Sequence, residues 1–159
     1  MMQTANVAAA HLAHGNAYRE RARGRSDTAC QLAALEAYQA ALAADPLSLE
    51  AHLNMGDVLR ELGRNEAAVA AYERALGVLP GMALIYLKLV QAKRMTLGDP
   101  AFARLMTLVE SMAALPSEQQ MYLHFAAGKA LDDIGLVDEA FDHFAKGNAL
   151  KQRTLPQNE

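Results

Sequence analysis

Histidine is the residue type in this chain best suited to hold a metal ion, and five histidines are spread over its 159 residues. His11 and His14 are three apart, which places both rings on one face of a helix. A zinc site needs at least three protein ligands, and no third ligand stands at a defined spacing from this pair. His52 and His124 fall on apolar helix faces as packed, hydrogen-bonded rings, and His143 is expected to face water. The sequence therefore predicts no metal site.

Two other groups of residues could suggest catalysis or phosphate binding. The acidic group comprises Asp132, Asp133, Asp138, Glu139 and Asp142. It falls at a predicted turn and in the first turn of the next helix, where each carboxylate stabilises the helix dipole by about 0.3 to 1 kcal/mol. Gly147, Asn148 and Lys151 lie near a helix C-terminus, whereas a phosphate site needs a free helix N-terminus. We therefore expect no enzyme activity and no bound cofactor.

The helices that position these residues are predicted from a sequence repeat of 34 residues. Ala34, Tyr38, Ala41, Leu42 and Pro46 recur as Ala68, Tyr72, Ala75, Leu76 and Pro80. A period of this length is typical of a repeated helical hairpin, because one hairpin cannot bury its apolar face alone. We predict an all-α fold without strands, in which eight helices form about four hairpins stacked as a right-handed superhelical solenoid.

The hairpin with the clearest pattern spans residues 48–78. Ser48 is a suitable N-cap after Pro46, and an apolar face follows at His52, Met55, Gly56 and Leu59. Gly63 ends this helix and Asn65 is predicted to cap the next one. Gly56 is expected to be small because the two helices cross closely there.

The order of residues in this hairpin resembles a tetratricopeptide repeat (TPR), with His52 in place of the usual aromatic residue. A second copy starts at Met121 and includes His124, Gly128 and Phe144. We expect hairpins at about 4–44, 48–78, 82–114 and 117–152 in a single domain of residues 1–153, followed by a frayed tail at 154–159. In the third hairpin, a helix over about 82–96 is followed by Asp99 as the next N-cap.

The first helix is the least regular of the predicted elements. It is expected to extend over residues 4–23, with Val7, Leu12 and Tyr18 as its larger apolar groups. Terminal helices of repeat proteins often depart from the consensus in this way.

Residues 82–153 also resemble the repeat region of bacterial TPR-containing sulfotransferases. The matching positions include Asp99, Pro100, Arg104, Leu105, Phe125, Gly128, Asp133, Gly135, Phe141, Phe144, Gly147, Asn148 and Arg153. In that family a sulfotransferase domain follows the repeats, whereas no strand, glycine-rich loop and helix succession occurs in this sequence. The resemblance therefore implies, as an alternative function, a regulatory or scaffolding N-terminal arm whose catalytic domain is absent.

The TPR resemblance also implies a binding surface, because the first helix of each pair lines a concave groove. Arg19 and Arg23 are four apart and share a face. Extending that face through later repeats gives the candidate partner-binding set Arg19, Arg23, Asn54, Asp57, Lys88, Gln91 and Lys129. This set resembles the clamp by which some TPR proteins hold a peptide carboxylate, with exposed Leu53, Leu84 and Leu87 beside it. The favoured function is a non-catalytic module that binds a peptide or partner segment, acidic or ending in a carboxylate.

The composition limits the other classes of partner. The formal net charge of −3 gives no electrostatic reason to bind nucleic acid or an anionic membrane. The N-terminus lacks the pattern of a secretory signal, and one cysteine, Cys30, excludes an internal disulfide, so we expect a cytoplasmic protein. A homodimer through the terminal helices is a further hypothesis, because solenoid ends expose apolar surface.

Overall fold

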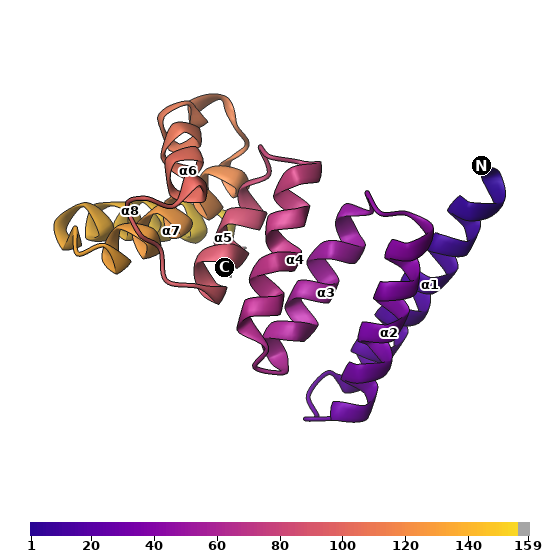
Figure 1. The fold of residues 1–159 in the computed structure, drawn as a ribbon. Helices are drawn as coiled ribbons and strands as arrows, with labels where there is room; N and C mark the ends of the chain where they lie inside the picture. The colour runs from indigo at the N-terminus through magenta and orange to yellow at the C-terminus, as the bar shows by residue number, and fades with distance from the viewer. Residues whose placement is uncertain (156–159) are drawn as a thin grey trace. The chain divides into compact units, whose positions relative to one another are not determined.

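The computed structural model describes residues 1–155 and consists of α-helices joined by short loops (Figure 1). The helices are α1 (Met2–Ala22), α2 (Thr28–Ala44), α3 (Leu49–Glu61), α4 (Asn65–Val78), α5 (Ala83–Ala92), α6 (Pro100–Glu110), α7 (Ser117–Asp133) and α8 (Val137–Thr154), with a 3₁₀ turn at Met112–Ala114. Residues 1–155 contain no strand, which confirms the all-α fold with eight helices. Thr154 belongs to α8 rather than to a frayed tail, and the tail predicted beyond Leu155 lies outside the described residues.

The chain divides into two compact units, Met1–Pro80 and Gly81–Glu159. The first unit contains α1 to α4 and the second contains α5 to α8. The single continuous domain of residues 1–153 stays a prediction.

In the first unit α1 packs along α2, α2 along α3, and α3 along α4, so two helical hairpins follow in series. Asp27 caps α2 by accepting a hydrogen bond from the Cys30 N–H at 3.1 Å. Ser48 caps α3 in the same way, from the Ala51 N–H at 3.3 Å. The cap at Ser48 agrees with the sequence prediction, and both caps satisfy N–H groups that the helix itself leaves without partners.

The predicted cap at Asn65 is wrong. Asn65 is the first helical residue of α4, and the N-cap position belongs to Arg64, which makes no side-chain capping bond. Gly63, in the turn before α4, adopts a φ of +74°. This conformation lets the Arg64 N–H donate back to the Leu59 carbonyl at 2.8 Å.

A glycine of the first helix faces a tyrosine ring of the second in both hairpins of this unit. A Cβ added to Gly15 would lie 2.5 Å from Cε1 of Tyr38, and one added to Gly56 would lie 2.5 Å from Cε1 of Tyr72. Both tyrosines are fully buried. The close helix crossing predicted at Gly56 is therefore confirmed, and Gly15 marks the same position in the first hairpin.

The larger apolar residues of α1 do not mark its packed face. Val7 is 48% exposed and Tyr18 is 37% exposed, whereas the buried residues of the helix are Ala8, Gly15 and Ala22. These small residues repeat every seven positions, and they allow α1 to approach α2 closely. In this helix the small side chains, not the large ones, mark the packed face.

In the second unit α7 is the helix against which α5, α6 and α8 all pack. α7 and α8 form a hairpin of the same kind as those of the first unit. Its glycine is Gly128, where an added Cβ would lie 2.8 Å from the ring of Phe144. A Cβ added to Gly147 would lie 3.0 Å from the ring of Phe125, which supports helix packing rather than phosphate binding at that residue.

α5 ends at Ala92, four residues before the predicted end at Thr96. The segment after it is fixed by two carboxylates. Asp133 at the end of α7 accepts a hydrogen bond from the Met95 N–H at 2.9 Å, and Lys93 pairs with Asp99 at 2.5 Å. Asp99 also caps α6, with Pro100 as its first residue, as predicted. The helix stops early because these contacts hold the chain in an extended conformation.

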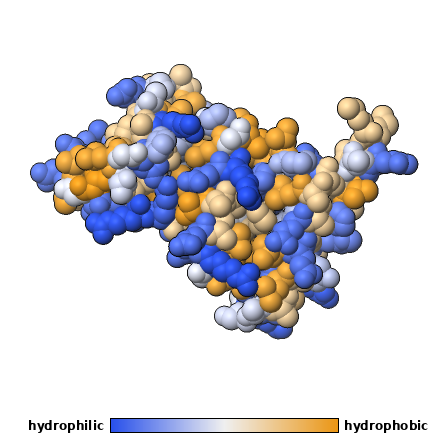
Figure 2. All heavy atoms as spheres, viewed as in Figure 1, coloured by the Kyte–Doolittle hydropathy of each residue, from blue (hydrophilic) through white to orange (hydrophobic). Residues whose placement is uncertain are grey.

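None of the helices in residues 1–155 combines the length and the apolar character needed to cross a membrane. Hydrophilic and hydrophobic residues are interleaved over the face of the molecule shown in Figure 2.

Candidate functional site

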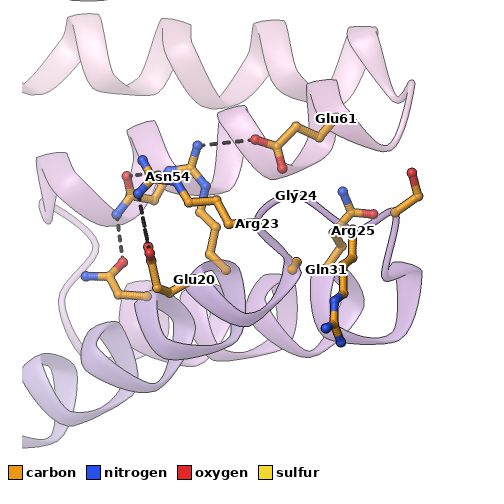
Figure 3. A pocket seen from close by; sticks show the side chains of 11 residues that line it. Glu20, Arg23, Gly24, Arg25, Gln31, Asn54 and Glu61 are labelled. Carbon is orange, nitrogen blue, oxygen red and sulfur yellow. Dashed lines mark hydrogen bonds and ion pairs between the residues drawn. The ribbon is translucent and has the colours of Figure 1, made fainter.

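The first unit contains an open pocket of about 680 Å³ between α1, the loop that follows it, the start of α2, and α3 (Figure 3). Its lining consists mainly of polar and charged residues. These are Asn16, Arg19, Glu20, Ala22, Arg23, Gly24, Arg25, Ser26, Gln31, Asn54 and Glu61. The pocket exists because α1 and α3 lie on the same side of α2, and Gly24, with a φ of +76°, turns the chain at its edge.

Arg19 connects α1 to α3 at the floor of this pocket. Its guanidinium donates to Asn54 Oδ1 at 3.4 Å, to Asp57 Oδ2 at 3.1 Å and to Glu61 Oε1 at 3.3 Å. Burial by itself would lower the pKa of Arg19, but the carboxylates of Asp57 and Glu61 outweigh that effect and raise it. Arg19 is therefore a permanently charged part of the floor that already contacts Asn54, Asp57 and Glu61.

Two buried tyrosines complete this network from the second helix of each hairpin. The Tyr38 hydroxyl donates to Asn16 Oδ1 at 2.8 Å, and the same oxygen accepts from Asn54 Nδ2 at 2.9 Å. The Tyr72 hydroxyl donates to Asp57 Oδ1 at 2.7 Å. Burial raises the pKa of Tyr38 to about 12 and raises that of Tyr72 as well, so both hydroxyls remain protonated donors. The side chains of Asn54 and Asp57 are thus held in one orientation.

The rim of the pocket carries charges that are exposed to solvent. Arg23 pairs with Glu20 at 3.3 Å, and these side chains are 80% and 70% exposed. Exposed ion pairs of this kind contribute only about 0 to 1 kcal/mol, so Arg23 can exchange Glu20 for another carboxylate at little cost. Arg25 is exposed and makes no ion pair within residues 1–155. The rim therefore offers two guanidinium groups to a ligand.

Four of the seven predicted partner-binding residues come together in the first unit. Arg19, Arg23 and Asn54 line the pocket, and Asp57 lies beneath it in contact with Arg19. The other three belong to the second unit. These are Lys88 and Gln91 on α5, and Lys129 on α7. One groove that includes all seven stays a prediction.

Within the second unit, Lys129 is already paired with Asp133 on its own helix. Asp133 holds the Met95 N–H with its other oxygen, and its main-chain carbonyl accepts from Arg94 at 3.1 Å. Asp133 is the last residue of α7, next to the predicted turn, and its carboxylate also fixes the segment that follows α5. Of the leucines expected to be exposed beside the groove, Leu53 differs from the prediction. Leu53 is only 8% exposed and belongs to the core.

Sequence reasoning missed Asn16, Glu61 and the two tyrosine hydroxyls. Glu61 stands one helical turn after Asp57, and that spacing was available as a signal. Asn16 follows Gly15 as Asp57 follows Gly56, so it would have been found had Gly15 been recognised as the crossing glycine.

The histidines form a pair in the second unit. Nδ1 of His124 lies 3.0 Å from Nδ1 of His143, so His143 is half-buried and does not face water as predicted. Burial lowers the pKa of both rings, and the charge of the His143 ring lowers that of His124 further. His52 is buried and its Nε2 lies 2.8 Å from the Pro46 carbonyl, in agreement with a packed ring. No cluster of three or more metal-ligating residues is found in residues 1–155.

Comparison with solved structures identifies the fold. A crystal structure of MamA superimposes with a TM-score of 0.65 at 22% sequence identity, over 92% of this chain and 79% of that one. A second MamA structure gives a TM-score of 0.54 at 17% identity over the full length of both chains, and "MamA MSR-1 C2" gives 0.57 at 19% identity. The chain has a TPR-like fold. No family model and no curated protein matches the sequence. The likeness to sulfotransferase repeats stays a prediction.

Proposed function

We propose that this chain is a non-catalytic interaction module whose first unit holds an acidic segment of a partner protein in the pocket between α1 and α3. The proposal rests on one observation above the others, which is the polar floor fixed by Arg19, Asn54 and Asp57. Its groups are oriented before any ligand arrives, because Tyr72 donates to Asp57, and Tyr38 donates to the Asn16 oxygen that also accepts from Asn54. A site that is organised in advance loses less conformational entropy on binding.

The rim determines the sign of the ligand. Arg19 is neutralised by Asp57 and Glu61, so it orients polar groups rather than attracting charge. Arg23 and Arg25 are the guanidinium groups that a partner can reach, and each can form a two-pronged contact with a carboxylate. Glu20 and Glu61 also line the pocket, so they repel any further acidic group of the ligand that does not reach Arg23 or Arg25. The pocket therefore favours one carboxylate at the rim, followed by polar main chain across the floor.

A peptide-display selection tests this proposal. A random dodecapeptide library with free C-termini is selected on the immobilised chain, and enriched peptides are measured by isothermal titration calorimetry. We expect enrichment of a single acidic side chain or a free C-terminal carboxylate. The double variant Arg23→Glu/Arg25→Glu should weaken the enriched peptides at least about tenfold, in line with the loss of two charge-assisted contacts.

The control is Arg74→Glu, which makes one such charge reversal, half the change of the double variant, on the exposed side of α4 and away from the pocket. It should leave the affinity within about twofold, because exposed charges that do not touch the ligand act only through a screened field. An equal loss in the control, or enrichment of peptides without any acidic group, contradicts the proposal.

A further inference from the structure

The last helix, α8, carries large apolar side chains on its outer face. Phe141 is 72% exposed and Val137, one helical turn earlier, is 61% exposed. Leu136, immediately before the helix, is 43% exposed. A soluble helix normally buries residues of this size, so this face is incomplete in a single copy of the chain.

Alignment of the hairpins shows that this face of α8 is equivalent to a buried face of α2. Gly15 with Tyr38 and Gly128 with Phe144 make the same contact in the first and last hairpins. When these contacts are aligned, Phe141 takes the place of Leu35, since each stands three residues before the aromatic ring. Leu35 is only 7% exposed because α2 packs against both α1 and α3. Phe141 therefore occupies a position that a following helix covers in the first unit.

The same alignment identifies a face of α1 that lacks its partner. Gly15 corresponds to Gly56, so Ala10 and Ala17 of α1 correspond to Ala51 and Val58 of α3. Ala51 and Val58 are fully buried in α3, which packs against α2 on one side and α4 on the other. Ala10 and Ala17 are exposed, so no helix within residues 1–155 covers this face of α1. Their small side chains leave room for a bulky ring.

Charge complementarity points to these two faces as partners. Consecutive helices in a hairpin repeat run antiparallel, so a helix docked on α8 as α3 docks on α2 would bring its C-terminus to the start of α8. The first turn of α8 holds Asp138 and Glu139. The last turn of α1 holds Arg21, which is exposed and makes no ion pair in the described part of the chain. Opposite charges and antiparallel helix dipoles both favour this arrangement.

We propose that a second copy of this chain docks its α1 on the outer face of α8, so that copies associate head to tail. In this contact Phe141 packs over Ala10 and Ala17 of the second copy, and Asp138 faces Arg21. The surface on one copy differs from the surface on the other, so the contact is heterologous and leaves a free end at each terminus. Association should therefore continue beyond the dimer as concentration rises.

Sedimentation velocity of the full chain over a range of concentrations from about 1 to 500 μM tests this proposal. The weight-average mass should rise past that of a dimer. Phe141→Asp blocks the α8 face and Ala17→Glu blocks the α1 face, and both residues are exposed, so each variant should keep the circular dichroism spectrum of the parent chain. In each variant alone, association should be at least about tenfold weaker than in the parent chain. Phe141→Asp removes the buried ring, and Ala17→Glu buries a charge in the contact.

A mixture of the two variants distinguishes a heterologous contact from a symmetric one. Each variant keeps one intact face, so the mixture should form a one-to-one dimer and nothing larger. A charge exchange adds a second test: Asp138→Arg and Arg21→Glu should each weaken association, and the two together in one chain should restore it.

Three results overturn the proposal. A constant monomer mass for the parent chain excludes the contact altogether. A dimer that Phe141→Asp abolishes and Ala17→Glu leaves unchanged shows a symmetric contact between two α8 helices. Association that neither variant affects places the interface elsewhere on the chain.

Discussion

The contact between Gly56 and Tyr72 determines whether a larger side chain at position 56 stabilises or destabilises the protein. Alanine is favoured over glycine in a helix interior by about 0.5 to 1 kcal/mol, so Gly56→Ala would stabilise α3 if nothing lay nearby. The added Cβ would instead lie 2.5 Å from Cε1 of a fully buried ring. That ring cannot move freely, because its hydroxyl is bound to Asp57 at 2.7 Å. The two effects oppose each other, and the larger one determines the result.

Overpacking of a core costs about 1 to 3 kcal/mol, which exceeds the gain in helix propensity. We expect Gly56→Ala to lower the free energy of unfolding by about 1 to 2 kcal/mol, and Gly56→Leu by about 2 to 3 kcal/mol or more. The matched control is Gly77→Ala on the neighbouring helix α4. Gly77 is exposed and nothing lies within 4 Å of an added Cβ, so this variant should gain about 0.5 kcal/mol.

Urea unfolding followed by far-UV circular dichroism measures each variant. The slope of the unfolding free energy against urea should stay constant, so that the change in midpoint reports stability. The double variant Gly56→Ala/Tyr72→Leu should lose less than the sum of its parts, because removal of the ring removes the clash. If Gly56→Ala unfolds at or above the midpoint of Gly77→Ala, close crossing at this glycine does not limit the side chain, and the packing argument fails.

Two further predictions concern a helix cap and a histidine pair. Ser48→Ala should lower the free energy of unfolding by about 1 kcal/mol through loss of the α3 cap, whereas Ser26→Ala, in an exposed loop, should leave it unchanged within error in the same urea assay. Stability should also decrease as pH falls below 6.5, because the folded pKa values of His124 and His143 lie below that usual value, and the unfolded chain binds protons that the folded chain does not. Unfolding free energies measured between pH 7.5 and 5 should show this decrease, and His143→Gln should reduce it; a pH-independent parent chain would contradict the burial of the pair.

The hairpin of α3 and α4 could be predicted from sequence because its determinants are local. The offset of 34 residues and the glycine at Gly56 reflect contacts within one hairpin, and the structure has them where the pattern places them. The register of α1 could not be found in the same way. Its buried positions are Ala8, Gly15 and Ala22, and a helix of small residues gives no contrast between its faces.

The early end of α5 depends on a residue far away in the sequence. The Met95 N–H is held by Asp133, which lies 38 positions further along the chain. Local propensity over 82–96 favours a continuous helix, and it was overridden by this tertiary contact. The pairing of Lys129 with Asp133 was missed for a related reason: a lysine four residues before an aspartate suggests a solvated pair, and only the fold shows that the carboxylate is nearly buried.

The candidate site was predicted in part for a physical reason. Arg19, Asn54 and Asp57 were placed on one surface because each lies on the first helix of a hairpin, and the structure brings them into contact. What could not be predicted is that Asp57 and Glu61 would both pair with Arg19. Charges on one face were expected to await a ligand, whereas partial burial favours pairing them within the protein.

The difference between the hairpins follows from one hydroxyl group. In the first unit the residue after each crossing glycine, Asn16 or Asp57, is held by a tyrosine from the second helix of its hairpin. In the last hairpin the ring is Phe144, which has no hydroxyl, and the residue after the glycine is Lys129. A cation there has no acceptor beneath it, so it turns to Asp133 on its own helix. In these three hairpins the aromatic residue of the second helix therefore decides whether the first helix presents an oriented polar group after its crossing glycine.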